Sequence, residues 1–148
     1  MTALVLVLDT NVVLDLFVYE DPATVPLRAA LAEPQTRWLT TAVMREELRR
    51  VLAYPQVVKR LNARALMADA VLASFDACAQ LVDIAPKAPY TCKDADDQQF
   101  IDLAVAHRAA LLSKDKAVLC MTKRLATLGV AVSRQWAPVA IQSTPTTA

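Results

Sequence analysis

The sequence predicts an α/β domain, a three-layer α/β/α sandwich with helices on both faces of a mainly parallel sheet. Its apolar runs, rich in valine and leucine, lack the polar alternation of a sheet that is exposed on one face, so both faces of each strand should be covered. These runs alternate with segments of helical periodicity, which is the order that repeated strand–helix–strand crossovers produce. The chain of 148 residues is long enough for one such domain with a hydrophobic core.

The strands are expected at the short apolar runs, namely residues 3–8, 37–40, 81–84, 110–113 and 130–132. The helices are expected between them, at residues 12–19, 24–31, 41–52, 61–81, 96–108 and 115–128. Thr41 can cap the third of these helices and Pro55 ends it, while Gly129 fits the C-terminal cap of the last. Residues 1–137 are expected to form the domain, and the Thr- and Pro-rich residues 138–148 a disordered tail.

The composition excludes several classes of protein. A single glycine, Gly129, rules out a glycine-rich dinucleotide or phosphate loop. Cys78, Cys92 and Cys120 form no C-x-x-C pair, so buried, reduced cysteines are expected rather than a zinc site or a disulfide framework. With 16 basic and 15 acidic side chains, the net charge of +1 does not identify a nucleic-acid binder. Neither a signal peptide nor a membrane-spanning run is evident, so a cytoplasmic protein without a membrane partner is expected.

Acidic side chains follow two of the predicted strands. Asp9 comes directly after residues 3–8, and Asp115 follows residues 110–113. Sites in parallel sheets form beyond the carboxyl ends of the strands. We therefore expect both carboxylates at the same edge of the sheet.

The predicted helix at residues 41–52 carries two glutamates on different sides. With about 100° of rotation per residue, Glu46 lies nearly opposite the apolar stripe of this helix and should be solvated. Glu47 lies on the flank of that stripe, between Val43 and Val51. A carboxylate at the edge of a buried face costs desolvation free energy unless a cation compensates it, so Glu47 is the better metal ligand.

A cluster of aspartates opens the predicted helix at residues 96–108. Asp97 heads its buried stripe, whereas Asp102 points away from that stripe and should be solvated. Asp94 and Asp96 are alternate ligands, and Asp96 can instead cap the helix.

Each acid has a structural explanation when it is taken singly, because aspartates at helix starts are favourable N-caps. Gathered without a cation, however, four carboxylates would repel each other. Asp9, Glu47, Asp97 and Asp115 together form an oxygen-rich site that suits Mg²⁺ or Mn²⁺. The hydrogen-bonding neighbours expected to orient these carboxylates are Asn11, Thr41 and Ser113.

Four segments of the chain, in order, resemble the motifs of PIN domains. Residues 8–12 (LDTNV), a strand followed by D-T-N, resemble the opening motif. Residues 41–48 (TAVMREEL) resemble the second motif, whose Glu-Leu pair selects Glu47.

The other two motifs lie further along the chain. Residues 94–104 (DADDQQFIDLA) are similar to the D-x-D-D-x-x-F-x-x-L-A stretch of one PIN subgroup. Residues 111–116 (LLSKDK) resemble the fourth motif, with Ser113 in place of the more usual threonine. The spacing from Asp97 to Asp115 is also similar to that of the family.

The resemblance implies a PIN-like sandwich and an endoribonuclease that cleaves RNA phosphodiester bonds with Mg²⁺ or Mn²⁺. The catalytic residues it implies are Asp9, Glu47, Asp97 and Asp115. Many small bacterial members, such as ribonucleases similar to virulence-associated toxin C, are toxins of type II toxin–antitoxin systems and are often dimeric. The implied partners are therefore an RNA substrate, a cognate antitoxin and a second copy of the chain. A non-catalytic PIN-like module that binds RNA or protein is the alternative.

Basic side chains near these motifs are weaker candidates for RNA contacts. Arg45, Arg49 and Lys114 would bind phosphates or form a solvated face. The only histidine, His107, lies toward the far end of its helix and is expected at the surface. A phosphoryl-transfer α/β protein also places acids at strand ends, but Asn11 occupies the second position of the D-x-D motif that haloacid dehalogenase-like hydrolases need.

Overall fold

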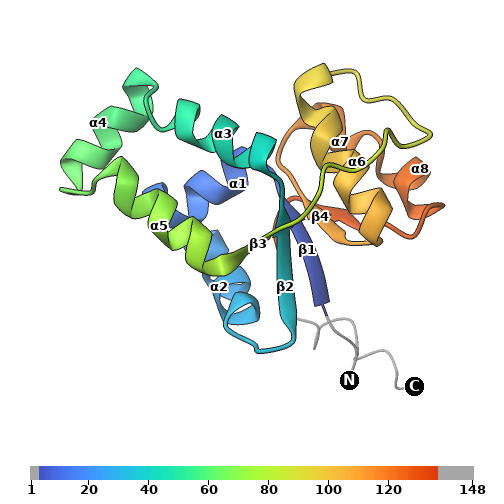
Figure 1. Cartoon of the computed structure of the whole chain (residues 1–148), viewed down its shortest axis with the longest axis horizontal. Coiled ribbons are helices and arrows are strands. Elements are labelled where there is room, and N and C mark those ends of the chain that lie inside the picture. Colours follow the sequence, from blue (N-terminus) through green and yellow to red (C-terminus); the bar gives the residue numbers. More distant parts are fainter. Residues whose placement is uncertain (1–3, 137–148) are drawn as a thin grey trace.

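The computed structural model describes residues 4–136, so the tail expected at residues 138–148 lies outside the described residues. Five parallel strands form one sheet in the order β3-β2-β1-β4-β5. Their bounds are β1 Leu4–Leu8, β2 Thr36–Thr40, β3 Ala79–Leu81, β4 Ala110–Leu112 and β5 Val132–Ser133. Helices lie on both sides of this sheet (Figure 1), so the predicted α/β class with a parallel sheet is confirmed.

The two layers of helices come from different parts of the chain (Figure 1). One layer consists of α1 Thr10–Leu14, the π-helical turn η1 Asp15–Tyr19, the 3-10 turn η2 Pro22–Thr24, α2 Val25–Leu31, α3 Ala42–Val51, α4 Pro55–Ala63 and α5 Ala68–Cys78. The other consists of the 3-10 turn η3 Ala95–Asp97, α6 Gln98–His107, α7 Lys116–Leu119 and α8 Thr122–Ala126. Among residues 4–136, no helix has both the length and the apolar character needed to cross a membrane.

The sheet separates two hydrophobic cores, because successive side chains of a strand point to opposite faces. On β1, Leu6 packs into the core on the side of α1 and α5, whereas Val7 packs into the core on the side of α6. On β2, Trp38 joins the first core, where its ring stacks on Phe17 at a centroid distance of 6.0 Å and meets Phe75 edge-on at 5.1 Å. Burial on both faces explains why the strands are unbroken apolar runs in the sequence.

The single helix expected at residues 61–81 is wrong, because the chain forms α4 and α5 with a break at Ala65, whose φ is 52°. The Leu66 amide donates a hydrogen bond of 2.9 Å back into the last turn of α4, which closes that helix. Arg64 donates to the carbonyl of Val18 in η1 at 2.8 Å and so ties the break to a distant turn. This contact is tertiary, so apolar periodicity could not reveal the break.

Several predicted boundaries shift by a few residues. The third strand lies at Ala79–Leu81 rather than at residues 81–84, and the last begins at Val132. The last predicted helix is split into α7 and α8. Pro55 does more than end a helix, because it also begins α4, where its missing N–H would have had no intrahelical partner.

Candidate metal centre

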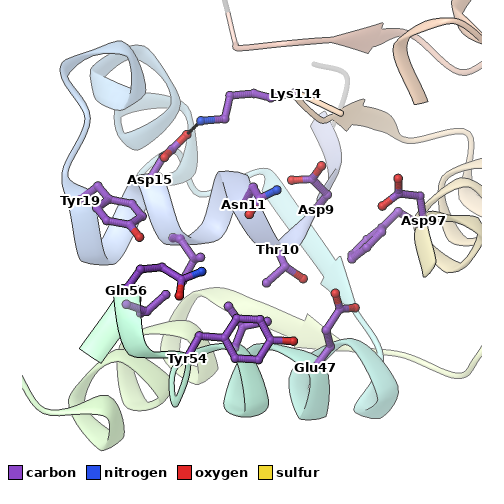
Figure 2. A pocket seen from close by; sticks show the side chains of 14 residues that line it. Asp9, Thr10, Asn11, Asp15, Tyr19, Glu47, Tyr54, Gln56, Asp97 and Lys114 are labelled. Atoms are coloured by element: carbon purple, nitrogen blue, oxygen red, sulfur yellow. Dashed lines mark ion pairs between the residues drawn. The ribbon is translucent and has the colours of Figure 1, made fainter. Parts of the chain in front are cut away.

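The carboxyl ends of the strands border a pocket of about 420 Å³. Asp9 reaches it from the end of β1, Glu47 from α3, and Asp97 from η3. Figure 2 shows these three carboxylates at the same end of the pocket. Since β1 lies between β2 and β4, the segments that follow these strands converge at one edge of the sheet. The fold therefore brings side chains together that are far apart in the sequence.

Asp9 is held by hydrogen bonds on both of its carboxylate oxygens, and it is only 3 % exposed. Oδ1 accepts a hydrogen bond of 3.0 Å from the Val12 amide, which caps α1, and Oδ2 accepts one from the Ser113 hydroxyl. Burial raises the pKa of Asp9, and the two hydrogen bonds lower it in part. Asp9 is thus both a helix cap and a fixed carboxylate of the pocket.

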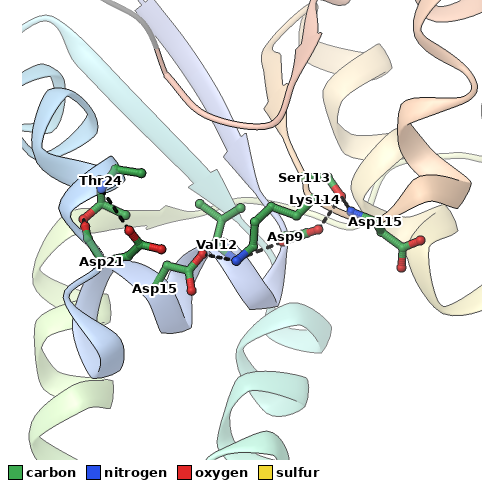
Figure 3. A network of polar contacts seen from close by, with 9 residues as sticks. Asp9, Val12, Asp15, Asp21, Thr24, Ser113, Lys114 and Asp115 are labelled. Atoms are coloured by element: carbon green, nitrogen blue, oxygen red, sulfur yellow. Dashed lines mark hydrogen bonds and ion pairs between the residues drawn. The ribbon is translucent and has the colours of Figure 1, made fainter.

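Ser113 links Asp9 to Asp115 (Figure 3). It is fully buried, and its hydroxyl donates to Asp9 while it accepts a hydrogen bond of 3.1 Å from the Asp115 amide. Asp115 in turn caps α7 by accepting a hydrogen bond of 2.8 Å from the Ala117 amide. Ser113 therefore orients one acidic side chain and the backbone of another acidic residue.

Asp97 is the least compensated carboxylate of the site. It is 9 % exposed, and within residues 4–136 no hydrogen-bond partner is found for its buried Oδ2. Burial raises the pKa of Asp97 to about 8, with further contributions from the adjacent Asp115 carboxyl and from the charges of Asp94 and Asp9. The ionised form of Asp97 is therefore unfavourable in these surroundings, and a nearby cation would stabilise it.

Asp97 also belongs to a second, tighter group with Asp94 and Asp115. One carboxylate oxygen from each of the three lies within 4.8 Å of the others. Of the two alternate ligands, Asp94 is in this group, whereas the exposed Asp96 is not. The expectation that Asp96 caps the helix is wrong, because Asp94 caps η3 by accepting a hydrogen bond of 2.9 Å from the Asp96 amide.

Glu46 and Glu47 point to different sides of α3, as the helical periodicity predicted. Glu47 is half-buried in the pocket, and the Gln99 amide donates to its Oε1 at 2.6 Å. Burial raises the pKa of Glu47, and hydrogen bonds from Thr10 and Gln99 offset part of this rise. Glu46 instead pairs with Arg49 on the outer surface of the helix at 2.5 Å.

Two other predicted polar residues have different surroundings from those expected. Asp102, expected to be solvated, is half-buried and accepts hydrogen bonds of 2.8 Å from the Ala88 amide and from the Gln98 side chain. It therefore fastens the loop before η3 to α6. Thr41 caps α3 as predicted, through a hydrogen bond of 3.2 Å from the Met44 amide, but it does not line the pocket.

The basic candidates are engaged in ion pairs within the chain. Arg45 pairs with Asp76 at 2.7 Å, and Lys114 pairs with Asp15 (Figure 3). Lys114 lines the pocket, whereas Arg45 and Arg49 do not. The Arg45–Asp76 pair is exposed and contributes little to stability, whereas the Asp15 side chain of the other pair is only 13 % exposed. RNA contacts by Arg45, Arg49 and Lys114 stay a prediction.

The remaining expectations concern single residues. Asn11 is exposed and lines the pocket. His107 is exposed at the end of α6, as predicted. The three cysteines are free thiols; Cys92 is buried as expected, whereas the expectation of burial is wrong for Cys78 and Cys120, which are exposed.

Sequence reasoning missed five polar residues that line the pocket, namely Thr10, Asp15, Tyr19, Tyr54 and Gln56. Thr10 had a signal, because it stands inside the D-T-N segment. Tyr54 and Gln56 come from the junction of α3 and α4, and no sequence pattern placed that junction beside β1.

The donor set fits a small divalent cation. Asp97 and Asp115 lie in the tight group with Asp94. Asp9 and Glu47 line the pocket with Asp97, whereas Asp115 is not among the lining residues of that pocket. All of these side chains offer carboxylate oxygens, which are the ligands that Mg²⁺ and Mn²⁺ prefer. The buried Oδ2 of Asp97, which has no partner among the described residues, lies where a cation would offset both desolvation and repulsion.

The comparison with known families agrees with this geometry. The sequence profile of the PIN domain matches residues 5–117, a segment that runs from β1 to the start of α7 and includes all four predicted acids. No curated protein matches the chain in sequence. On the match to most of its length, this chain belongs to the PIN-domain family.

Proposed function

We propose that this protein is a metal-dependent endoribonuclease that hydrolyses RNA phosphodiester bonds. PIN domains are generally nucleases, and this chain has the acidic residues that such an activity needs. The observation that carries the proposal is the buried, uncompensated Oδ2 of Asp97, next to carboxylates from other segments of the chain.

Asp9, Asp97 and Asp115 are the proposed ligands of one or two Mg²⁺ or Mn²⁺ ions, with Glu47 as a ligand directly or through water. When bound, such an ion makes water more acidic and offsets negative charge on the phosphate and the leaving oxygen. Asp94 is the alternate ligand, because it shares the tight group of Asp97 and Asp115.

The protein's own side chains hold these groups in position and assist the proton transfer. Ser113 fixes the carboxylate of Asp9, and Gln99 fixes that of Glu47. Burial raises the pKa of Glu47, so its carboxylate would be a better proton acceptor than a fully exposed glutamate. Lys114 at the rim can exchange its pairing with Asp15 for a phosphate of the RNA.

We further propose that the protein is the toxin of a toxin–antitoxin pair. Membership of the PIN-domain family supports this proposal, because many bacterial members of the family are such toxins. Induced expression should arrest bacterial growth, Asp9→Asn should relieve the arrest, and co-expression of a cognate antitoxin should neutralise it. Growth that is unaffected by the wild-type protein would refute the toxin role without refuting the nuclease.

The nuclease proposal is tested with purified protein and short single-stranded RNA in Mn²⁺, with and without EDTA. We expect cleavage in Mn²⁺, none in EDTA, and a loss of about 100-fold or more for Asp9→Asn with the fold intact. Asp69→Asn, which changes an exposed aspartate of α5, is the matched control and should cleave like the wild type. Mn²⁺ should also raise the melting temperature of the wild type.

Cleavage that persists in EDTA, or in Asp9→Asn, would contradict the metal mechanism. RNA binding without cleavage under every metal condition would favour a non-catalytic PIN-like module instead.

A further inference from the structure

The pocket extends well beyond the acids. Its opposite end is lined by Tyr19, Tyr54 and Gln56, with Leu14 and Val57 among the apolar residues of its wall. Figure 2 shows Tyr19 and Gln56 on the far side from Asp9 and Asp97, with Tyr54 between them and its hydroxyl end toward Glu47. One continuous pocket thus has an acidic end and an aromatic end.

At the aromatic end, Tyr19 packs in part against the hydrophobic core, whereas Tyr54 is exposed. Tyr54 is 47 % exposed, so its ring is accessible from the pocket that it lines. Among residues 4–136, the side chains of Tyr19, Tyr54 and Gln56 make no hydrogen bond to the protein. Their polar groups are therefore available to a ligand, while Val57, 2 % exposed, gives the wall a rigid apolar base.

The position of Tyr54 is fixed by the backbone. Its carbonyl accepts hydrogen bonds of 2.9 Å from the amides of Val57 and Val58, which starts α4, and its own amide donates to Val51 of α3 at 2.9 Å. The ring therefore stands on a rigid junction between two helices. Because the backbone at this junction is already ordered, little backbone conformational entropy is lost when a ligand stacks on the ring.

We propose that the aromatic end of this pocket holds the base of one unpaired RNA nucleotide next to the cleaved bond, stacked against Tyr54 and Tyr19 and contacted at its edge by the Gln56 amide. This inference rests on the proposed ribonuclease function and deepens it. Bases of single-stranded RNA are bound by stacking on aromatic rings and by hydrogen bonds to their exposed edges, whereas bases in a duplex offer neither. A side-chain amide provides both a donor and an acceptor for such an edge. The substrate is therefore unpaired RNA, and Gln56 sets its base preference.

The experiment first maps the bond that the wild type cleaves in a short single-stranded RNA. The two nucleotides that flank this bond are then replaced, one at a time, by an abasic ribose, and kcat and KM are measured for the wild type and for Tyr54→Ala. At one of the two positions, we expect the abasic substitution to lower kcat/KM of the wild type by about tenfold or more, mainly through KM. The same substitution should leave kcat/KM of Tyr54→Ala unchanged, because the stacking partner is already lost.

Conservative variants separate stacking from base reading. Tyr54→Phe retains the ring and should retain the wild-type sensitivity to the abasic nucleotide. Gln56→Ala should flatten the preference among the four bases at that position. Val58→Ala on the same helix and Gln35→Ala in an exposed loop do not line the pocket and should behave like the wild type.

Failure of this inference is distinguishable from failure of the proposed function. If the wild type cleaves RNA but tolerates abasic nucleotides on both sides of the bond, the base subsite is refuted and the nuclease stands; this measurement needs no variant. Equal abasic effects in the wild type and Tyr54→Ala also refute it. A wild type that neither binds nor cleaves single-stranded RNA overturns both.

Discussion

Asp9 and Asp97 are two buried carboxylates of one pocket that the protein stabilises very differently. Asp9 accepts hydrogen bonds on both oxygens, from the Val12 amide and the Ser113 hydroxyl. Asp97 has an Oδ2 without a partner among the described residues and a pKa raised to about 8. The protein thus compensates Asp9 in part through its own hydrogen bonds, whereas Oδ2 of Asp97 lacks such compensation among the described residues.

The two carboxylates therefore have different roles in the same acidic site. Asp9 is pre-positioned, because capping α1 and accepting from Ser113 fix its side chain before anything binds. Asp97 provides the binding free energy for a cation, because its ionised form is unfavourable without one. Substitutions at Asp97, or at Ser113 beside Asp9, change one of these two carboxylates at a time.

The largest effect is expected for Asp97→Asn. Loss of a ligand should reduce RNA cleavage by about 100-fold or more and abolish the stabilisation by Mn²⁺. In EDTA the same variant should be more stable than the wild type by about 1–3 kcal/mol, because an uncompensated buried acid is removed. Urea unfolding with and without Mn²⁺ measures both changes. Asp9→Asn is the control, since it should lose activity without gaining stability; a metal-free Asp97→Asn less stable than the wild type would contradict the comparison.

The stability of the metal-free protein should depend on pH in an unusual direction. The pKa of Asp97 is raised from 3.8 to about 8 on folding, so between these values the folded state holds a proton that the unfolded state has released. Stability in EDTA should therefore fall as pH rises from about 4 to about 8. Asp9 and Glu47, whose pKa values are also raised by burial, act in the same direction.

Chemical unfolding in EDTA across this pH range measures the slope. Asp97→Asn should reduce it, and Mn²⁺ should oppose the loss at the alkaline end, where the carboxylates are free to bind it. Metal-free stability that rises steadily from pH 4 to 8 would show that Asp97 is ionised without a cation.

A smaller effect is expected for Ser113→Ala, which removes the hydroxyl that holds the Asp9 carboxylate in place. The variant leaves Oδ2 of Asp9 and the Asp115 amide without their partner, so we expect a loss of about 10- to 100-fold in activity or metal affinity. Unfolding stability should fall by about 1 kcal/mol. Ser113→Thr retains the hydroxyl and should retain activity, and Ser74→Ala on the surface of α5 is the neutral control. Unchanged metal affinity in Ser113→Ala would mean that Asp9 needs no such support.

The smallest effect is expected for Glu46→Gln. Glu46 pairs with Arg49 outside the pocket, so its variant should cleave RNA like the wild type. Glu47→Gln, one position along the same helix, should lower cleavage strongly because its side chain lines the pocket. Steady-state kinetics of the two variants measures the contrast, and the reverse order would place the site on the other face of α3.

Much of the fold could be predicted because it is encoded locally. Strands that are buried on both faces must be continuous apolar runs, so β1, β2 and β4 were found within a residue or two. Helical periodicity separated Glu46 from Glu47 for the same reason, since α3 is regular and its buried face is apolar. The break between α4 and α5 was missed because Arg64 and η1, which stabilise it, are far apart in the sequence.

The sequence by itself determined the α/β class, the parallel sheet and the four acids proposed as ligands, because strand ends and helix faces follow from periods of a few residues. Only the tertiary structure decided which acid lacks a partner, that Asp94 rather than Asp96 lies against Asp97 and Asp115, and that Tyr54 and Gln56 complete the pocket. Burial, repulsion between carboxylates and the walls of a pocket depend on distances between segments that are remote in the chain. Sequence patterns that span only a few residues do not encode those distances.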